Sequence, residues 1–375
     1  MAWHKKKKYR GLRRAMQFSA FVAIALALAG MALAAAVSNQ AVFPAAGPSN
    51  NPIGSNDPTP TSQPSSRKID AFLDANEQQY RVALTRTRSW LDALEVNPTD
   101  LRAHGIKGKK KLAELLDVYL RLYEVAAPAD KPVLLERIRG IATVTATPGY
   151  HDMARIDDKQ FKEDSTSYLR VAFLMDRFGL NTKLYRQEIV KVLPRLNDHM
   201  KYRGSDQRMA FHLYYQHFGL EEPFPLAAAF KAGVIAARHD PAWFKQNKME
   251  MYNLTHEIFV PYEFGEKLDA AFFSDPDKAS LRPLLADLTA YGIGVDDADI
   301  TAELTSCLRY LHFTDLPVYQ ESLQYLLKSQ RPDGKWGNYE RHRGYYGDYV
   351  NQAFYLHTTL VVVDALTTAF HYREQ

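Results

Sequence analysis

From residue 68 onward, apolar side chains recur every three to four positions, and no convincing run of alternating apolar and polar residues interrupts them. This period is typical of amphipathic helices and not of strands. Asp-Pro pairs mark several expected starts, and glycines mark several expected ends. The pattern predicts helices at 69–93, 99–125, 128–141, 158–178, 182–200, 205–218, 225–237, 246–260, 278–291, 297–312, 317–329 and 350–371.

An aromatic residue before glycine recurs where three of these helices end. The pairs are Phe178-Gly179, Phe218-Gly219 and Phe264-Gly265, with glycines spaced by 40 and 46 residues. Glycine commonly ends a helix by adopting the left-handed conformation, so each copy alone could be an ordinary cap. The spacing suits helical hairpins. We therefore expect residues 68–375 to form one all-α domain of hairpins, either a closed α/α ring or an open solenoid.

The N-terminus has a different pattern. Residues 1–17 are a basic stub, and the apolar run from Phe18 to Val37 is about long enough to span a bilayer as a helix. Positive charge on one side only predicts that Met1 stays in the cytoplasm. Ala34-Ala-Ala36 is a plausible cleavage site, so residues 18–37 are either a transmembrane signal anchor or a removable signal peptide.

Residues 38–67 are rich in Pro and Ser and predict a disordered stalk. The body beyond has 39 basic and 42 acidic side chains, which gives no electrostatic reason to expect nucleic acid as a partner. Cys307 is the single cysteine, so no intrachain disulfide is possible. A bacterial inner-membrane protein with its body in the periplasm fits best, and a protein secreted after signal cleavage is the alternative.

The stretch from Leu323 to Gly337 runs from a helical pattern through Gln330 into Arg-Pro-Asp-Gly and Trp336. This arrangement resembles the QW motif of terpene cyclases and the related repeats of protein prenyltransferase β subunits. The resemblance implies an α/α toroid, a ring of helical hairpins around a central cavity. Gln330 and Trp336 are then expected to lock a helix end and to take no part in chemistry. The Asp-rich acid motif of class II terpene cyclases is absent.

Tyr355-Leu-His357-Thr-Thr resembles the Tyr-His-Thr segment of prenyltransferase β subunits, whose histidine is a zinc ligand. In that family an Asp-x-Cys pair lies about sixty residues earlier, and the matching positions here are Asp297 and Asp299. Without the thiolate, prenyl transfer to cysteine is not expected. A helical wheel places Asp297 in line with the buried stripe and Asp299 nearly opposite. The metal ligands predicted are therefore His256, Asp297 and His357, with zinc, manganese or iron as the candidate metal.

Thr255-His256-Glu257 ends the helix predicted at 246–260, and Val260 rules out the HExxH protease pattern. Beside the candidate ligand His256, Glu257 is a candidate general base, and Tyr252 lies one turn earlier on the face of His256. His151 and Asp152, in a loop before a helix, are further candidate catalytic residues. Each has a plain structural alternative, as a helix cap, a core residue or a turn.

No phosphate-binding glycine loop, dinucleotide fingerprint or serine nucleophile elbow is present. The sequence therefore predicts an exported, membrane-anchored enzyme that acts by hydrolysis, elimination or group transfer on a glycan, lipid-linked or peptide substrate. Sugar lyase or hydrolase chemistry without metal, using Glu257 or Asp297 with Tyr and His, is one alternative. A non-catalytic helical-repeat protein that binds an envelope partner or polymer is another.

Overall fold

The computed structural model describes residues 64–268 and 271–372, and all regular secondary structure in that part of the chain is helical. The predicted stub at 1–17 and apolar run at 18–37 lie outside the described residues, as does most of the predicted stalk at 38–67. Ser62–Gln375 form one compact unit. Its first helix begins at Pro64, within the stretch predicted as stalk.

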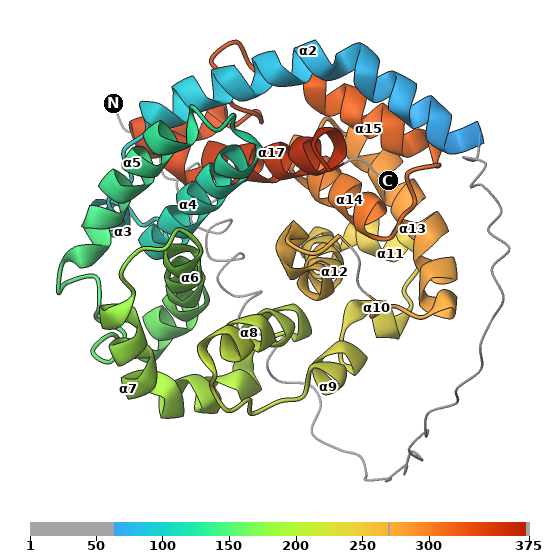
Figure 1. Cartoon of the computed structure of the whole chain (residues 1–375). Helices are drawn as coiled ribbons and strands as arrows, with labels where there is room; N and C mark the ends of the chain where they lie inside the picture. Colours follow the sequence, from blue (N-terminus) through green and yellow to red (C-terminus); the bar gives the residue numbers. More distant parts are fainter. Residues whose placement is uncertain (1–63, 269–270, 373–375) are drawn as a thin grey trace, which may run out of the picture. The chain divides into compact units, whose positions relative to one another are not determined.

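The helices divide into those that lie near the middle of Figure 1 and those outside them. The middle group is α4 (Gly108–Val125), α6 (Asp158–Arg177), α8 (Ser205–Phe218), α12 (Lys248–Phe259), α14 (Ala298–Tyr310) and α17 (Leu356–Phe370). The longer outer helices are α2 (Pro64–Asp92), α5 (Lys131–Ala142), α7 (Lys183–His199), α13 (Asp275–Gly294) and α15 (Pro317–Lys328). Shorter helices are α3 (Pro98–Ala103), α9 (Leu226–Lys231), α10 (Val234–Ala237), α11 (Pro241–Gln246) and α16 (Arg343–Tyr346). Single turns occupy Thr143–Ala146, Met200–Tyr202, Val260–Gly265, Glu340–His342, Gly347–Tyr349 and the π-helical Asn351–Tyr355.

The middle helices contact one another in a closed cycle. Within the described residues α4 packs on α6, α6 on α8, α8 on α12, α12 on α14, α14 on α17, and α17 back on α4. The outer helices then pack on members of this cycle, for example α5 on α4 and α13 on α14. Each middle helix is covered on several sides, which explains why α4 and α14 are buried over most of their length.

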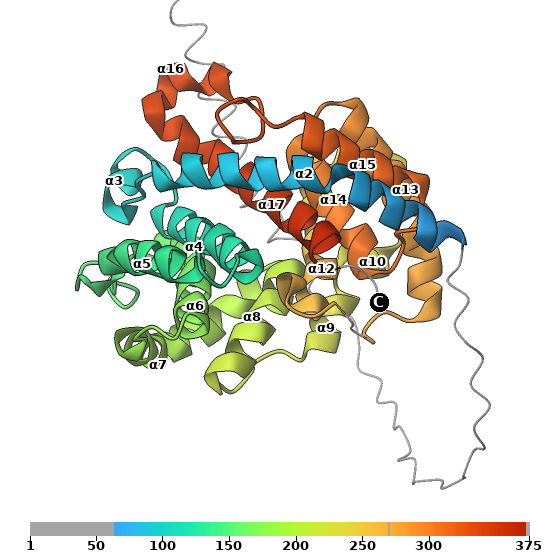
Figure 2. The same cartoon turned by 45° about the horizontal axis from the view of Figure 1, so that its top comes forward.

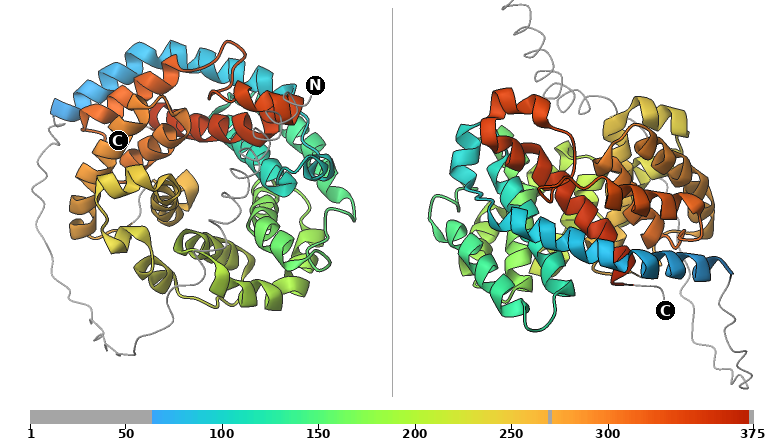
Figure 3. Two further views of the ribbon diagram at one scale, coloured as in Figure 1. Left: turned by 180° about the vertical axis from the view of Figure 1, so that it is seen from behind. Right: turned by 90° about the horizontal axis from the view of Figure 1, so that it is seen from above.

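The cycle closes because helices from the two ends of the chain pack together. α2 lies along α17 and α15 (Figures 1 and 3). At this junction the Gln330 side chain donates a hydrogen bond to the carbonyl of Ala83 at 2.9 Å. The fully buried Trp336 ring donates from Nε1 to the carbonyl of Leu326 at 2.7 Å. Gln330 thus joins the turn after α15 to α2, and Trp336 holds that turn against α15.

Two local patterns differ from their prediction. The helix predicted at 99–125 is broken after Ala103, because Gly105 has a φ of +74° and so adopts the left-handed conformation that glycine favours. The third Phe-Gly pair is not an ordinary helix cap like Gly219. Phe264 itself has a φ of +55°, and the turn Val260–Gly265 packs on α8, α12 and α14.

Among the described residues, one helix, Asn351–Phe370, is long and apolar enough to cross a membrane. It consists of the π-helical turn followed by α17. Most of its length is buried inside the domain, where α17 packs on α4 and α14. Its apolar composition is therefore that of a core helix.

Candidate histidine and carboxylate site

Five of the middle helices each contribute one side chain to a polar cluster in the interior of the domain. These side chains, called the histidine cluster below, are Glu114 of α4, Asp206 of α8, His256 of α12, Glu303 of α14 and His357 of α17. They come together because the closed cycle of helices brings these positions to one place, although they span more than half of the chain.

The members of the histidine cluster form a chain of alternating carboxylates and imidazoles. Oε1 of Glu303 lies at its centre, 3.9 Å from Nε2 of His256 and 3.6 Å from Nε2 of His357. On the far side of each ring, Nδ1 faces a second carboxylate. The His256 ring is 4.0 Å from Asp206, and the His357 ring is 3.1 Å from Glu114. Each imidazole thus has a carboxylate near both of its nitrogens.

The central carboxylate is only partly satisfied. Oε2 of Glu303 accepts a hydrogen bond of 2.5 Å from the Thr255 hydroxyl, whereas Oε1 is buried and accepts none from the described residues. The Glu303 side chain is fully shielded, yet 38% of the His256 side chain and 24% of His357 are exposed. Solvent therefore reaches both imidazoles, while the carboxylate between them is out of its reach.

The surrounding carboxylates favour protonated histidines. Burial alone would lower the pKa of His357, but Asp299 and Glu114 outweigh it and raise the pKa to about 9. For His256, burial is likewise opposed by Asp206 and Glu303, and its pKa is raised. Burial would raise the pKa of Glu114, but the nearby Lys111, Lys110 and His357 hold it well below its usual range. At neutral pH His357 is thus an imidazolium beside the ionised carboxylate of Glu114.

Asp299 joins this cluster at its edge, and Asp297 does not take the position expected for it. Helix α14 begins at Ala298, and Asp297 is its extended N-cap, with φ −106°, so helical-wheel angles do not apply to Asp297. Its carboxylate pairs with Lys248. Asp299 is buried and lies 3.9 Å from Nε2 of His357, so the orientation predicted for this pair of aspartates is wrong.

Asp299 is held by hydroxyl groups from two neighbouring helices. Tyr252 donates to one of its oxygens at 2.8 Å, and Thr358 donates to the other at 3.0 Å. Burial and the nearby Asp299 and Glu303 raise the pKa of Tyr252 far above its usual value, so its phenol is neutral. Tyr252 therefore lies beside the histidine cluster, on the face of α12 that also carries His256.

A π-helical turn, Asn351–Tyr355, lies directly before His357. Such turns insert one extra residue into a helix and re-aim the side chains that follow. The preceding segment, 338–349, contains α16, which stands clear of the cycle in Figure 2. Tyr345 in this segment is 83% exposed. Tyr339 connects the segment to the site, since its hydroxyl lies 2.8 Å from that of Thr358.

A family match covers this whole arrangement. The model of the family described as Domain of unknown function (DUF6895) matches residues 80–367, a stretch that contains every member of the histidine cluster. The chain belongs to the DUF6895 family. No curated protein and no solved structure matches it. The predicted kinship of this DUF6895 protein with terpene cyclases and prenyltransferases stays a prediction.

Glu257 is not a member of the histidine cluster. Its buried carboxylate accepts hydrogen bonds from the Ser205 hydroxyl and from the backbone N–H groups of Val234 and Ile235, at 3.0 and 3.1 Å from the two backbone nitrogens. Gly233 leaves room for this approach, because a Cβ there would lie 2.2 Å from the carboxylate. Burial raises the pKa of Glu257 despite these bonds. Its contacts are those of a carboxylate that holds the short helix α10 in place.

His151 and Asp152 lie in a third environment, at the start of α4 and α6. Both nitrogens of His151 are engaged, Nδ1 by the Tyr168 hydroxyl at 2.5 Å and Nε2 by the Thr145 carbonyl at 2.7 Å. Burial lowers the pKa of His151. Asp152 pairs with the buried Lys109 at 2.8 Å. The structure therefore does not bring His151 and Asp152 together with the two other histidines.

A second buried group of charges, called the arginine cluster below, consists of Arg121, Tyr310 and Asp364. Nε of Arg121 lies 2.7 Å from Asp364, and the Tyr310 hydroxyl donates to the same carboxylate at 3.1 Å. Arg121 also donates to Glu124 at 3.0 Å and to the Phe264 carbonyl. Here the cation is in direct contact with its partners.

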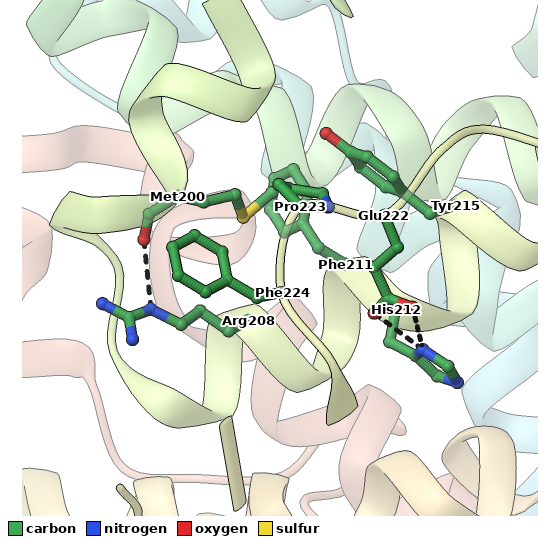
Figure 4. Close-up of a pocket in the computed structure, with 8 residues that line it drawn as sticks. All are labelled: Met200, Arg208, Phe211, His212, Tyr215, Glu222, Pro223 and Phe224. Carbon is green, nitrogen blue, oxygen red and sulfur yellow. Dashed lines mark hydrogen bonds and ion pairs between the residues drawn. The ribbon is translucent and has the colours of Figure 1, made fainter. Parts of the chain in front are cut away.

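A separate pocket lies beside α8 and the loop that follows it (Figure 4). Its polar groups are already paired. Nδ1 of His212 is 2.7 Å from Glu222, and Nε of Arg208 donates to the Met200 carbonyl at 3.1 Å. This pocket therefore offers fewer free groups than the histidine cluster.

Sequence reasoning singled out both histidines of the cluster but missed Glu114, Asp206 and Glu303. One signal was available for two of them, because Glu114 and Glu303 each lie within a helix that is otherwise buried. A glutamate at such a position needs a partner. In residues 64–268 and 271–372, no three His, Cys, Asp or Glu side chains are arranged to hold a metal ion.

Proposed function

We propose that this domain is an α/α toroid and that the histidine cluster at its centre is an acid–base catalytic site. The closed cycle of six middle helices in the described residues, with further helices packed outside it, supports the toroid. The hydrogen bond from Gln330 to Ala83 supports it as well, since it joins α2 to the turn after the late helix α15.

One observation carries the catalytic proposal. Two solvent-accessible imidazoles lie on either side of a fully buried carboxylate oxygen that accepts no hydrogen bond from the described residues. Burying such charges costs several kcal/mol per ion (order of magnitude) in a purely structural role, so clusters of this kind concentrate at functional sites.

The chemistry follows from the protonation states. An imidazolium can give a proton to a leaving group, and the buried Glu303 stabilises the positive charge and fixes the direction of the ring. Glu114 does the same from the other side of His357, at 3.1 Å. Tyr252, hydrogen-bonded to Asp299, is a second group that can exchange a proton. The reactions that need only these groups are hydrolysis, elimination and group transfer.

The location is proposed from the sequence of residues 1–67. A basic stub, one apolar run and a Pro/Ser-rich spacer support a domain outside the cytoplasm of a bacterium, held at the inner membrane or secreted after signal cleavage. The substrates available there are envelope glycans, lipid-linked intermediates and peptides.

The test uses the full-length chain in detergent micelles against a panel of these three substrate classes. We expect turnover of one class, reduced by about 10²-fold or more in Glu303→Gln and His357→Asn, because each removes part of the proton relay. His342→Asn is the matched control, since His342 stacks on Phe354 in the exposed segment 338–349. No turnover of any class, combined with strong destabilisation in Glu303→Gln, would instead favour the non-catalytic partner-binding protein.

A divalent metal remains a second candidate, because Nε2 of both His256 and His357 faces the same Glu303 oxygen. Zinc, manganese or iron could be held there if the side chains, including Asp299, moved toward a common point. Metal–ligand bonds are about 2 Å long. Metal analysis of the purified chain decides between the two. A stoichiometric metal that is lost in both His357→Ala and Glu303→Ala supports the metal site, and metal-free active protein excludes it.

A further inference from the structure

The charges of the site are arranged in two layers that differ in exposure. The carboxylates lie farther from solvent, since the side chains of Glu303 and Glu114 are exposed by only 0% and 7%. Two side chains that carry nitrogen lie closer to solvent, since Lys110 is exposed by 47% and His256 by 38%. A ligand that approaches the site from solvent therefore meets Lys110 and the imidazole rings before it meets Glu303 or Glu114.

Lys110 is the cation that the cluster does not need for its own pairing. Glu114 already lies 2.8 Å from the buried Lys111 and 3.1 Å from His357. Lys110 Nζ is farther away, at 3.5 Å, and about half of its side chain is in solvent. At this separation it makes at best a weak hydrogen bond, so it can turn toward a ligand at little cost.

The same layering recurs at the edge of the site. Lys248 is 56% exposed, and its partner Asp297 is 19% exposed. Asp206 and Asp299, the remaining carboxylates beside the histidines, have side chains only 11% exposed. In these pairs the cation is the more accessible member, whereas Lys111 and Glu114 are equally buried, with side chains exposed by 8% and 7%.

We infer that the site takes a substrate that carries an anionic group, a carboxylate or a phosphate, seated against Lys110, His256 and His357. This inference rests on the proposed function and names the class of substrate. Lys110 Nζ and His357 Nδ1 lie 3.5 and 3.1 Å from the same oxygen of Glu114, so these two cations are close together and repel each other. An anion between them would relieve that repulsion and accept charge-assisted hydrogen bonds from them.

The experiment measures anion binding directly, so it does not depend on knowing the substrate. The full-length chain, labelled at the histidine rings and held in detergent micelles, is titrated with inorganic phosphate, with glucuronate and, as a neutral probe, with glucose. The ring signals of His256 and His357 are followed by NMR and assigned with the His256→Asn and His357→Asn variants. We expect phosphate or glucuronate to shift both signals saturably, and glucose at the same concentrations to shift neither.

Two lysine variants test the position of the anion. Lys110→Met should weaken binding about tenfold, the effect of losing one charge-assisted hydrogen bond. Lys191→Met is the matched control. Lys191 is 62% exposed and lies 3.7 Å from the largely buried Glu188, which repeats the geometry of Lys110 and Glu114 on the outer helix α7. It should bind like the unmodified chain.

The outcomes separate this inference from the proposed function. Saturable shifts at the two histidines that depend on Lys110 support it, and the probe that saturates at the lower concentration tells phosphate from carboxylate. Absence of a saturable shift, equal shifts with glucose, or unchanged binding in Lys110→Met overturns it. If a neutral substrate is nevertheless turned over in a way that requires Glu303 and His357, the proposed function stands without the anionic substrate.

Discussion

Three members of the histidine cluster lie on the same middle helices as the arginine cluster, two turns away from it. Their members are offset by seven residues on each helix, or about 10 Å along the axis. The pairs are Glu114 and Arg121 on α4, Glu303 and Tyr310 on α14, and His357 and Asp364 on α17. Because the backbone environment is shared, differences between the clusters reflect their side chains.

The contacts in the two clusters differ in closeness. Arg121 lies 2.7 Å from Asp364, whereas the imidazoles lie 3.6 and 3.9 Å from the central Glu303, and the shortest contact of an imidazole in the histidine cluster is the 3.1 Å between His357 and Glu114. Arg121 is buried, but both histidines keep contact with solvent. Closely paired buried charges hold helices together, and loosely paired accessible ones remain free to meet a ligand. We therefore expect the arginine cluster to serve mainly stability, and we propose chemistry for the histidine cluster.

The largest expected effect is on the arginine cluster. Arg121→Met should lower the free energy of unfolding by about 3–5 kcal/mol, because it leaves Asp364 buried without its cation. Denaturant unfolding followed by circular dichroism measures this. Arg139→Met, which removes an exposed pair with Glu136 on α5, is the control and should cost less than about 1 kcal/mol. Equal effects in the two variants would contradict the assignment of stability to Arg121.

A smaller effect should appear when pH is raised. The pKa of His357 is about 9 in the folded chain, above the ordinary value near 6.5 in the unfolded chain. Its contribution is therefore fully present below about pH 6.5 and is lost as pH rises through 9, by about 1–3 kcal/mol in total. Thermal unfolding between pH 6 and pH 10 measures it. In His357→Asn this part of the pH dependence should disappear, and an unchanged profile would show that His357 is not the group responsible.

The smallest change in stability is expected for Glu303→Gln, within about 1 kcal/mol in either direction, because glutamine can still accept the hydrogen bond from Thr255 and removes a buried charge. The free energy of unfolding of Glu303→Gln is measured at pH 7 and compared with that of Arg121→Met. The first variant alters the histidine cluster and the second alters the arginine cluster. A loss as large as that of Arg121→Met would mean that both clusters serve the fold.

The sequence predicts the helices of this domain well because their periodicity is local. The predicted helix 205–218 has the observed bounds, and 158–178 ends one residue late. The break after Ala103 was missed because it depends on the left-handed Gly105 and on the packing of α3 against α4, which hydrophobic periodicity does not show. A Cβ on Gly108 would lie 2.2 Å from the Pro98 carbonyl oxygen, so this glycine is needed for tertiary packing.

The site was predictable only in part, for a similar reason. His256 and His357 attract notice as single residues in apolar helices, but nothing local shows that they face one Glu303 oxygen. The orientation of Asp297 and Asp299 was predicted wrongly because the helix was expected to start at residue 297, one residue before its observed start at Ala298. Asp297 is therefore the N-cap and not part of the helix. Helix ends are uncertain by one or two residues in sequence reasoning.

The junction between Gln330 and Ala83 has a consequence for how the chain folds as it is made. The two residues are 247 positions apart, and the hydrogen bond between them joins α2 to the turn after α15. Of the described helices α2 emerges first, but its packing partners α15 and α17 emerge last. Closure must therefore wait for nearly the whole chain, and such non-local contacts slow folding. Until then, the apolar face of α2 is exposed and prone to aggregation. An open solenoid avoids this problem, because each of its repeats packs on the neighbouring repeat as the chain is made.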